Sequence, residues 1–100
     1  MLTSKQRAQL KSLAIDLDPV LIVGKGGVTE NVTMEAENAL HNRELIKGRV
    51  LENSLLTARE ALDAIAVAIG AESVQAIGSK FVLYKENKDL PEDKRIKLKK

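Results

Sequence analysis

Apolar residues near the start of the chain recur at the spacing of one helix face. They are Leu10, Leu13, Ala14 and Leu17. Because residues three and four apart lie on one side of an α-helix, this spacing predicts an amphipathic first helix. Thr3 and Gln6 fit a capping box at its start, in which each side chain accepts a backbone N–H of the other residue. Asp18 marks its end, because a residue before proline is pushed out of the α region.

A short apolar run comes next, at residues 20–23. Its β-branched residues predict a buried strand. Four residues with three glycines follow, and Thr29 then suits the N-cap of a second helix over residues 30–42. The residues expected on the inner side of that helix are Val32, Ala36, Ala39 and Leu40.

Residues 44–51 alternate with a period of two, which predicts a second strand. One face would carry Ile46, Gly48 and Val50 and turn inward. The opposite face would carry Leu45, Lys47, Arg49 and Leu51, and so present two cations. A glycine weakens the interior of a strand unless something packs closely against its backbone, so Gly48 predicts such a close approach.

The third helix is the most clearly marked element. Thr57 and Glu60 form a second capping-box pattern, and Gly70 stands where a left-handed glycine commonly ends a helix. Its apolar stripe is Leu62, Ile65, Ala66 and Ile69. Residues 72–77 and 80–84 then predict two strands, joined as a hairpin through Gly78 and Ser79.

The resulting element order is α-β-α-β-α-β-β, which predicts an α/β fold. A chain of 100 residues can enclose one core, so we expect a single domain over residues 1–84. Alternating helices and strands favour a sheet covered by helices, and the final hairpin makes that sheet mixed. Residues 85–100 are charged and poor in apolar side chains, which predicts a flexible C-terminal tail.

Composition narrows the possible classes. The chain has 44% hydrophobic and 30% charged residues, as globular domains do, and no cysteine, which excludes disulfides and thiolate chemistry. No signal-like or membrane-length apolar segment is present, so we expect a cytoplasmic protein with no membrane partner. The net charge of +2 is uneven: residues 1–84 carry nine basic and ten acidic groups, and residues 85–100 carry seven and four. An anion would therefore have to be bound by a local cluster of cations.

Catalysis finds little support in the residues. His41 is the only histidine, and without cysteine it can join neither a His-rich metal cluster nor a recognisable nucleophile motif. The carboxylates are scattered over helix faces. We therefore expect no enzyme activity, no metal, no cofactor and no small-molecule substrate.

The loop Gly24-Lys25-Gly26-Gly27 follows a strand and precedes a helix, where backbone N–H groups can hold a phosphate. It fails the stricter nucleotide motifs, because Thr29 replaces the third glycine of a dinucleotide loop and Gly26 follows the lysine of a would-be Walker loop. Its two outer glycines match the spacing by which KH domains clamp an RNA backbone. A tight turn that needs glycine is the alternative, and Glu30 would compete with a phosphate.

Other cations could join Lys25 in a phosphate track. Arg7 and Lys11 share one flank of the first helix, Lys47 and Arg49 share a strand face, and Lys80 lies at the hairpin. The only aromatic residues, Phe81 and Tyr84, fall on opposite faces of one strand. Recognition by a sheet of several stacking rings is therefore excluded.

Five segments spread over residues 2–84 carry a family resemblance. They are Leu2-Thr3-Ser4-Lys5-Gln6-Arg7, Leu17-Asp18-Pro19-Val20, Gly24-Lys25-Gly26-Gly27-Val28-Thr29, Glu44-Leu45-Ile46-Lys47 and Ile77-Gly78-Ser79-Lys80-Phe81-Val82-Leu83-Tyr84. In this order they resemble the YhbY family, the stand-alone bacterial members of the CRM domain (chloroplast RNA splicing and ribosome maturation). The tail segment Ile96-Lys97-Leu98 is also similar to the C-termini of that family.

The resemblance implies a four-stranded mixed sheet similar to the C-terminal domain of translation initiation factor three. It also implies RNA binding and association with precursors of the large ribosomal subunit. The RNA-binding role would fall on the loop residues Gly24, Lys25, Gly26 and Gly27, and more loosely on Lys5, Arg7, Lys11, Lys47 and Lys80. Two residues depart from the family pattern: Gly48, where a β-branched residue is usual, and Ser79, where a basic or amide residue is common.

Three functions remain open from the sequence. The leading one is a non-catalytic RNA-binding protein that docks on structured ribosomal RNA. The second is a protein-interaction module that contacts a ribosomal protein or assembly factor through the acidic second and third helices. The third is a small-nucleotide binder.

Overall fold

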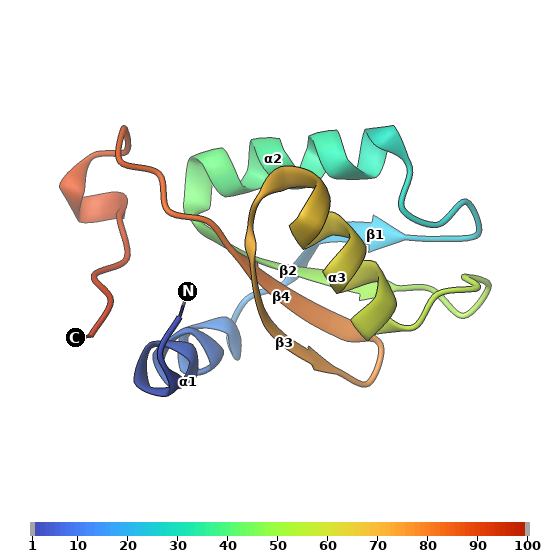
Figure 1. The fold of residues 1–100 in the computed structure, drawn as a ribbon, viewed down its shortest axis with the longest axis horizontal. Coiled ribbons are helices and arrows are strands. Elements are labelled where there is room, and N and C mark those ends of the chain that lie inside the picture. The colour runs from blue at the N-terminus through green and yellow to red at the C-terminus, as the bar shows by residue number, and fades with distance from the viewer. Residues whose placement is uncertain (1, 100) are drawn as a thin grey trace.

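The computed structural model describes residues 2–99, which form one sheet with helices on both faces (Figure 1). In chain order the elements are α1 (Ser4–Ala14), β1 (Pro19–Val23), α2 (Glu30–Arg43), β2 (Leu45–Val50), α3 (Ala58–Ile69), β3 (Glu72–Ile77), β4 (Lys80–Tyr84) and a short 3-10 turn η1 (Glu92–Lys94). The predicted order α-β-α-β-α-β-β is confirmed.

The strands lie in the order β1-β2-β4-β3. β1 and β2 are parallel, because α2 carries the chain back between them, whereas β4 is antiparallel to both of its neighbours. The predicted four-stranded mixed sheet is therefore confirmed, with β1 and β3 at its edges.

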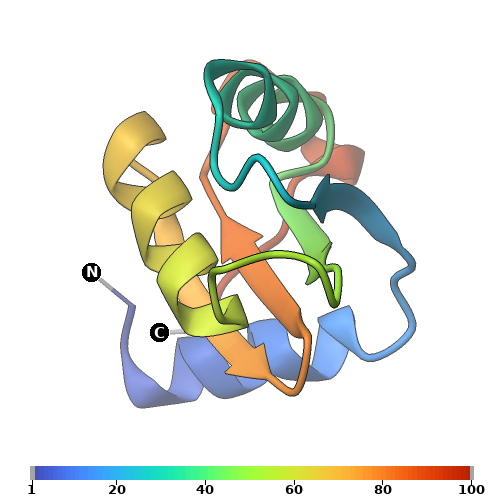
Figure 2. The same cartoon turned by 90° about the vertical axis from the view of Figure 1, so that its right-hand side faces the viewer.

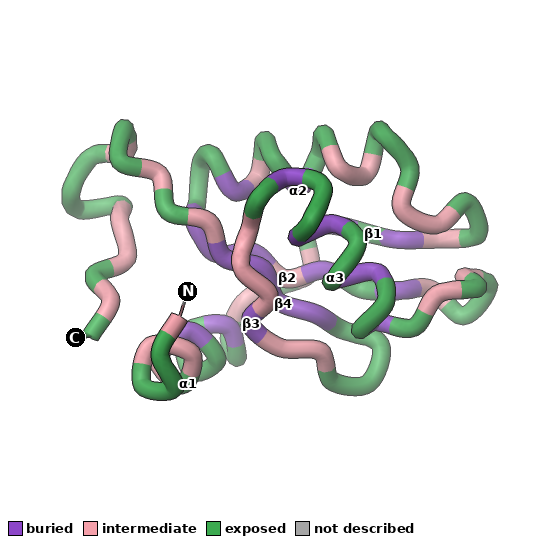
Figure 3. Tube along the Cα trace, viewed as in Figure 1, coloured by how far each residue is buried: buried purple, intermediate pink, exposed green. Residues whose placement is uncertain are grey.

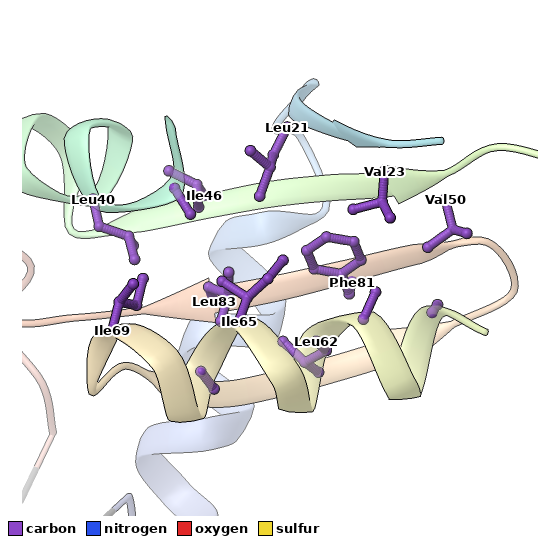
Figure 4. Close-up of a cluster of buried hydrophobic side chains, with 14 residues drawn as sticks. Leu21, Val23, Leu40, Ile46, Val50, Leu62, Ile65, Ile69, Phe81 and Leu83 are labelled. Carbon is purple, nitrogen blue, oxygen red and sulfur yellow. The ribbon is translucent and has the colours of Figure 1, made fainter. Parts of the chain in front are cut away.

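α2 and α3 cover one face of the sheet and enclose the larger apolar cluster (Figure 4). Alternate strand residues enter this cluster, as the period of two in β2 predicts: Ile46 and Val50 point into it. Phe81 lies at its centre, 1% exposed, against the backbone of Gly48. The close approach predicted at Gly48 is therefore confirmed, and its partner is the Phe81 ring.

α1 crosses the opposite face of the sheet (Figure 2). Leu10 and Ala14 pack there on a second apolar cluster, whose other buried members are Leu45, Val74, Val82 and Tyr84. Arg7 fixes the helix in place, because its guanidinium donates to the carbonyl oxygens of Ser73 and, at 3.0 Å, Val74 on β3. Ile22 on β1 is 43% exposed on this same face, so α1 leaves part of the face uncovered.

Predictions for the first helix and the first strand are partly wrong. α1 ends at Ala14 rather than at Asp18, so Leu17 lies beyond the helix. Leu13, which the apolar stripe places inward, is 47% exposed. The strand at residues 20–23 is not wholly buried, because β1 is an edge strand covered by α2 on one face only. Val20 and Ile22 therefore remain about two-fifths exposed, while Leu21 and Val23 are buried.

The segment after Tyr84 returns to the body of the domain. The backbone N–H of Ile96 donates to Glu44 at 2.6 Å, and that of Lys99 donates to Gln9 on α1 at 2.9 Å. Ile96 and Leu98 pack beside the second apolar cluster, and the segment contains both exposed and half-buried residues (Figure 3). The flexibility expected of this tail stays a prediction. Within residues 2–99, no helix has the length and apolarity that a membrane span requires.

Candidate functional site

The loop between β1 and α2 is a tight turn. The N–H of Gly27 donates to the carbonyl oxygen of Gly24 at 3.0 Å, and Gly27 has a left-handed φ of 71°, which disfavours any side chain there. Lys25 and Gly26 form its exposed tip. Thr29 caps α2 by accepting the N–H of Val32 at 3.2 Å, as predicted.

The same turn leaves donors available. The N–H groups of Lys25, Gly26 and Val28 donate to no atom of residues 2–99, and the Lys25 side chain is exposed. Glu30 is also exposed, in the first turn of α2, so one carboxylate lies close to the loop along the chain. The loop is thus a tight turn that still leaves N–H groups able to donate to a ligand.

Three connecting segments meet at one end of the sheet (Figure 2). The loop at residues 24–27 lies against residues 51–56, since the N–H of Leu51 donates to Val23 at 2.9 Å. The β3–β4 hairpin joins them, because Ser79 accepts the N–H of Val50 at 2.8 Å. The glycine loop is therefore one edge of a larger exposed surface.

The basic residues of β2 and β4 share the face that α1 only partly covers. Lys47 and Arg49 alternate with the buried Ile46 and Val50, and Arg49 lies opposite Lys80 in the β2–β4 register. Arg49 and Lys80 are exposed. The predicted shared strand face is confirmed, and the pairing adds a third cation to it.

Two adjoining hollows gather most of the predicted cations. The first, which we call the α1 hollow, measures about 280 Å³ between α1 and the sheet. It is lined by Lys11, Ala14, Ile15, Lys47, Gln75, Ile77, Lys80 and Val82. The second measures about 480 Å³ and includes Arg7, Lys11 and Arg59 in its lining. Neither lining contains a carboxylate, although Asp63 lies 3.7 Å from Arg59 beside the second hollow. The unopposed positive charge is therefore concentrated in the α1 hollow, from α1 to the hairpin.

Three of the predicted cations, Lys5, Lys25 and Arg49, lie outside these hollows. Lys5 is exposed in the first turn of α1 and lines neither hollow, and Lys25 at the tip of the glycine loop lines neither. Arg7 is half-buried and already bonded to β3, so it holds α1 in place as well as adding charge.

Sequence reasoning missed Arg59 and Glu44. Arg59 carries no signal beyond its exposed position in the first turn of α3, where it lies 3.7 Å from Asp63. The sequence pattern predicts Glu44 at the start of a strand, but Glu44 ends α2 with a φ of 61° and is fully buried. Burial and the charge of Glu44 raise the pKa of neighbouring Tyr84 to about 12. Glu44 therefore anchors structure and does not face the basic surface.

His41 has a structural neighbour in the tail. Its Nδ1 lies 3.2 Å from the amide nitrogen of Asn87, which also donates to the His41 carbonyl oxygen at 2.6 Å. Among the residues that the structure describes, no group of three or more His, Cys, Asp or Glu side chains is placed to hold a metal ion.

Comparison with known proteins gives one consistent result. The family model of the CRS1/YhbY (CRM) domain matches residues 2–85. A Bacillus subtilis protein named "Probable RNA-binding protein YqeI" is 43% identical over 98 residues, which cover 98% of this chain and 99% of that protein. A Haemophilus influenzae protein named "RNA-binding protein" is 41% identical over 88 residues, covering 88% of this chain and 89% of the relative.

A solved structure has the same fold. The solution structure of the hypothetical protein SAV1595 from Staphylococcus aureus superposes with a TM-score of 0.80 at 42% identity. The match covers 99% of this chain and all of that one. The α/β architecture therefore extends to a relative of nearly the same length.

Proposed function

The chain belongs to the CRS1/YhbY (CRM) domain family, and from this premise we propose that it is a non-catalytic RNA-binding protein. The observation that carries the proposal is the convergence of Lys11, Lys47 and Lys80 on one hollow that no carboxylate lines. Arg49 extends this charge along β2 beside Lys80. We call these four residues the basic face.

Phosphate groups are the ligand that this arrangement suits. Lysine and arginine side chains at the spacing of neighbouring strands can each neutralise one phosphate of a backbone, without reading its bases. Residues 2–99 offer no cage of carboxylates for a cation and no thiol or histidine cluster for catalysis. RNA would accordingly be held mainly through its charge and shape.

The glycine loop is the second contact that we propose. Gly26 has no side chain to keep a sugar–phosphate backbone away, and the N–H groups of Lys25 and Gly26 have no partner among residues 2–99. Lys25 adds one positive charge at the tip. In this role the loop would orient the RNA at the end of the sheet, while the basic face supplies most of the charge.

The RNA that we propose is a precursor of the large ribosomal subunit, met during ribosome assembly in the cytoplasm. Family resemblance supports this choice, and a backbone-directed surface suits structured RNA whose bases are mostly paired. Cross-linking the protein to RNA in cells and sequencing the adducts tests it. Adducts concentrated in large-subunit precursors support the proposal, and adducts spread in proportion to RNA abundance contradict it.

The binding itself is tested with purified protein. The double variant Lys47→Ala/Lys80→Ala should bind ribosomal RNA fragments more weakly than the wild type, by a similar factor for each sequence. Lys88→Ala is the matched control, because Lys88 is an exposed cation of the tail outside the basic face. Equal affinities for all three proteins would contradict the proposed surface.

A protein-binding role remains the second candidate. Met34 on the acidic helix α2 is 53% exposed and Val67 on α3 is 85% exposed, on the side of the sheet away from the basic face. Apolar side chains surrounded by charge can form the core of a contact with another protein. Co-migration with an assembly particle that survives RNase treatment would favour this role over direct RNA binding.

A further inference from the structure

The α1 hollow has an apolar floor and apolar walls. Ala14 and Val82 form the floor, at 2% and 3% exposure. Ile15, directly after α1, and Ile77, at the end of β3, are 74% and 66% exposed. Large aliphatic side chains that are this exposed beside a hollow indicate a site where an apolar part of a ligand can bind.

The two isoleucines stand on opposite sides of β4. Ile15 lies toward β2, because its carbonyl oxygen is 3.5 Å from Nζ of Lys47, whereas Ile77 is on β3 and pairs with Lys80. Arg7 holds α1 to β3 at the other end of the helix. The hollow is thus fixed by contacts at both ends of α1, and its width does not depend on a mobile loop.

The rim of the α1 hollow is polar and positively charged. Lys11, Lys47 and Lys80 come from three different elements, and Gln75 adds an amide that can both donate and accept hydrogen bonds. An apolar interior, a rim of cations and one amide together match the chemistry of a single nucleotide, whose base is apolar on its faces and polar at its edge.

We propose that the α1 hollow receives one unpaired base of the bound RNA. This inference rests on the proposed function and deepens it. The base would lie between Ile15 and Ile77, the lysines would hold its flanking phosphates, and Gln75 would contact its edge. A paired base cannot reach Val82 at the floor, because its faces are stacked and its edge is bonded to its partner, so the hollow selects an unstacked nucleotide.

The charges around the α1 hollow also favour one path of the RNA strand across the protein. Asp16 and Asp18 line a neighbouring hollow together with Arg43 and Lys47, so their carboxylates offset the positive charge on that side. Arg49 and Lys80 extend the positive charge on the other side, toward the hairpin. The RNA strand would therefore run from the hollow toward the loops at the end of the sheet, and not toward β1 and Asp18.

The experiment compares two RNAs that differ by one unpaired nucleotide. The first is a fully paired duplex, and the second is the same duplex with a single-nucleotide bulge. Binding is measured by fluorescence anisotropy for the wild type, Ile15→Ser and Ile77→Ser. The matched control is Val67→Ser, which removes an aliphatic side chain that is 85% exposed on α3, across the sheet. Thermal melting checks that each variant remains folded.

The wild type should prefer the bulged RNA. Ile77→Ser should weaken binding of the bulged RNA by about five- to tenfold and leave the paired duplex unchanged, since the apolar surface of Ile77 is covered only where a base is extruded. Val67→Ser should alter neither. With an abasic nucleotide at the bulge, the wild type should lose its preference for the bulged RNA. Its affinity should then equal that of Ile77→Ser.

Two results would overturn the inference. If Ile15→Ser and Ile77→Ser bind both RNAs as the wild type does, the hollow does not hold a base and suits a protein segment instead. If they weaken both RNAs equally, the isoleucines do not act on an unpaired nucleotide. If the wild type binds neither RNA, the proposed function itself is contradicted, and this result differs from the two outcomes above.

Discussion

The ring of Phe81 occupies the space that a side chain on Gly48 would need. A β-carbon built on Gly48 would lie 2.3 Å from Cζ of Phe81, well inside van der Waals contact. The two residues face each other in the β2–β4 register, and the ring fills the cluster beneath α2 and α3. Gly48 is therefore the gap in β2 that admits the only phenylalanine of the chain.

Gly48→Ala should lower stability although alanine suits a strand better than glycine. The methyl group would force the Phe81 ring out of its position in a close-packed interior, at a cost of about 1–3 kcal/mol. Urea unfolding followed by circular dichroism measures this loss.

The Phe81→Leu variant provides the control for that effect. Leucine removes the ring atoms that the new methyl meets, so Gly48→Ala should cost less in the Phe81→Leu background than in the wild type. An equal cost in both backgrounds would contradict steric conflict as the cause.

Helix starts were predictable from the sequence because their signals are local. The capping boxes Thr3–Gln6 and Thr57–Glu60 are both formed, and Gly70 ends α3 with a left-handed φ of 68°. Each of these signals involves residues within one helical turn. By contrast, the partial exposure of β1 depends on its place at the sheet edge, which the order of elements alone does not give.

The candidate site was predictable residue by residue but not as a surface. The sequence indicated Lys11, Lys47 and Lys80 as candidates, yet only the tertiary fold brings three elements to one hollow. The burial of Glu44 was missed for a similar reason. Its partners Asn87 and Ile96 lie 43 and 52 residues further along the chain, so no local pattern reveals them.

Glu44→Gln should destabilise the domain and loosen its tail. The buried carboxylate accepts the N–H groups of Asn87 at 2.7 Å and Ile96 at 2.6 Å, and a glutamine would turn an NH₂ group toward one of them. Loss of one such charged hydrogen bond costs about 1–3 kcal/mol. Limited trypsin digestion near Arg95 should become faster. Glu37→Gln, an exposed change on α2, is the control, and equal digestion of the two variants would contradict the role of Glu44.

The phenol of Tyr84 should ionise at a higher pH than that of an exposed tyrosine. Burial, with the charges of Glu44 and Glu86 in addition and Arg95 acting in the opposite direction, raises the pKa of its phenol to about 12. Because the folded pKa lies above the unfolded value of 10.0, this group contributes its full stability below pH 10.0 and loses it as the pH rises through about 12. Phenolate absorbance reports this tyrosine alone, since the chain has no other and no tryptophan. A midpoint near 10 in the folded protein would contradict its burial.

Substitutions in the glycine loop distinguish residues that it needs for its conformation from residues that would bind RNA. Gly27→Ala should cost about 1 kcal/mol of stability, because its φ of 71° disfavours a side chain. At Gly26 a β-carbon would lie 3.5 Å from Thr29, an ordinary contact, so Gly26→Ala should keep its stability and bind RNA more weakly. Lys25→Ala should likewise weaken binding across RNA sequences. Unchanged affinity in both Gly26→Ala and Lys25→Ala would move the contact away from this loop.

The dependence of RNA affinity on salt concentration shows whether the basic face and Lys25 contact the RNA backbone. If the basic face and Lys25 neutralise three to five phosphates, the logarithm of the association constant should fall against the logarithm of salt concentration with a slope of roughly −2 to −4. Lys47→Ala/Lys80→Ala should make that slope shallower by about one for each lysine, whereas Lys88→Ala should leave it unchanged. An affinity that does not vary with salt, or a slope that the double variant leaves unaltered, would contradict binding of RNA through this surface.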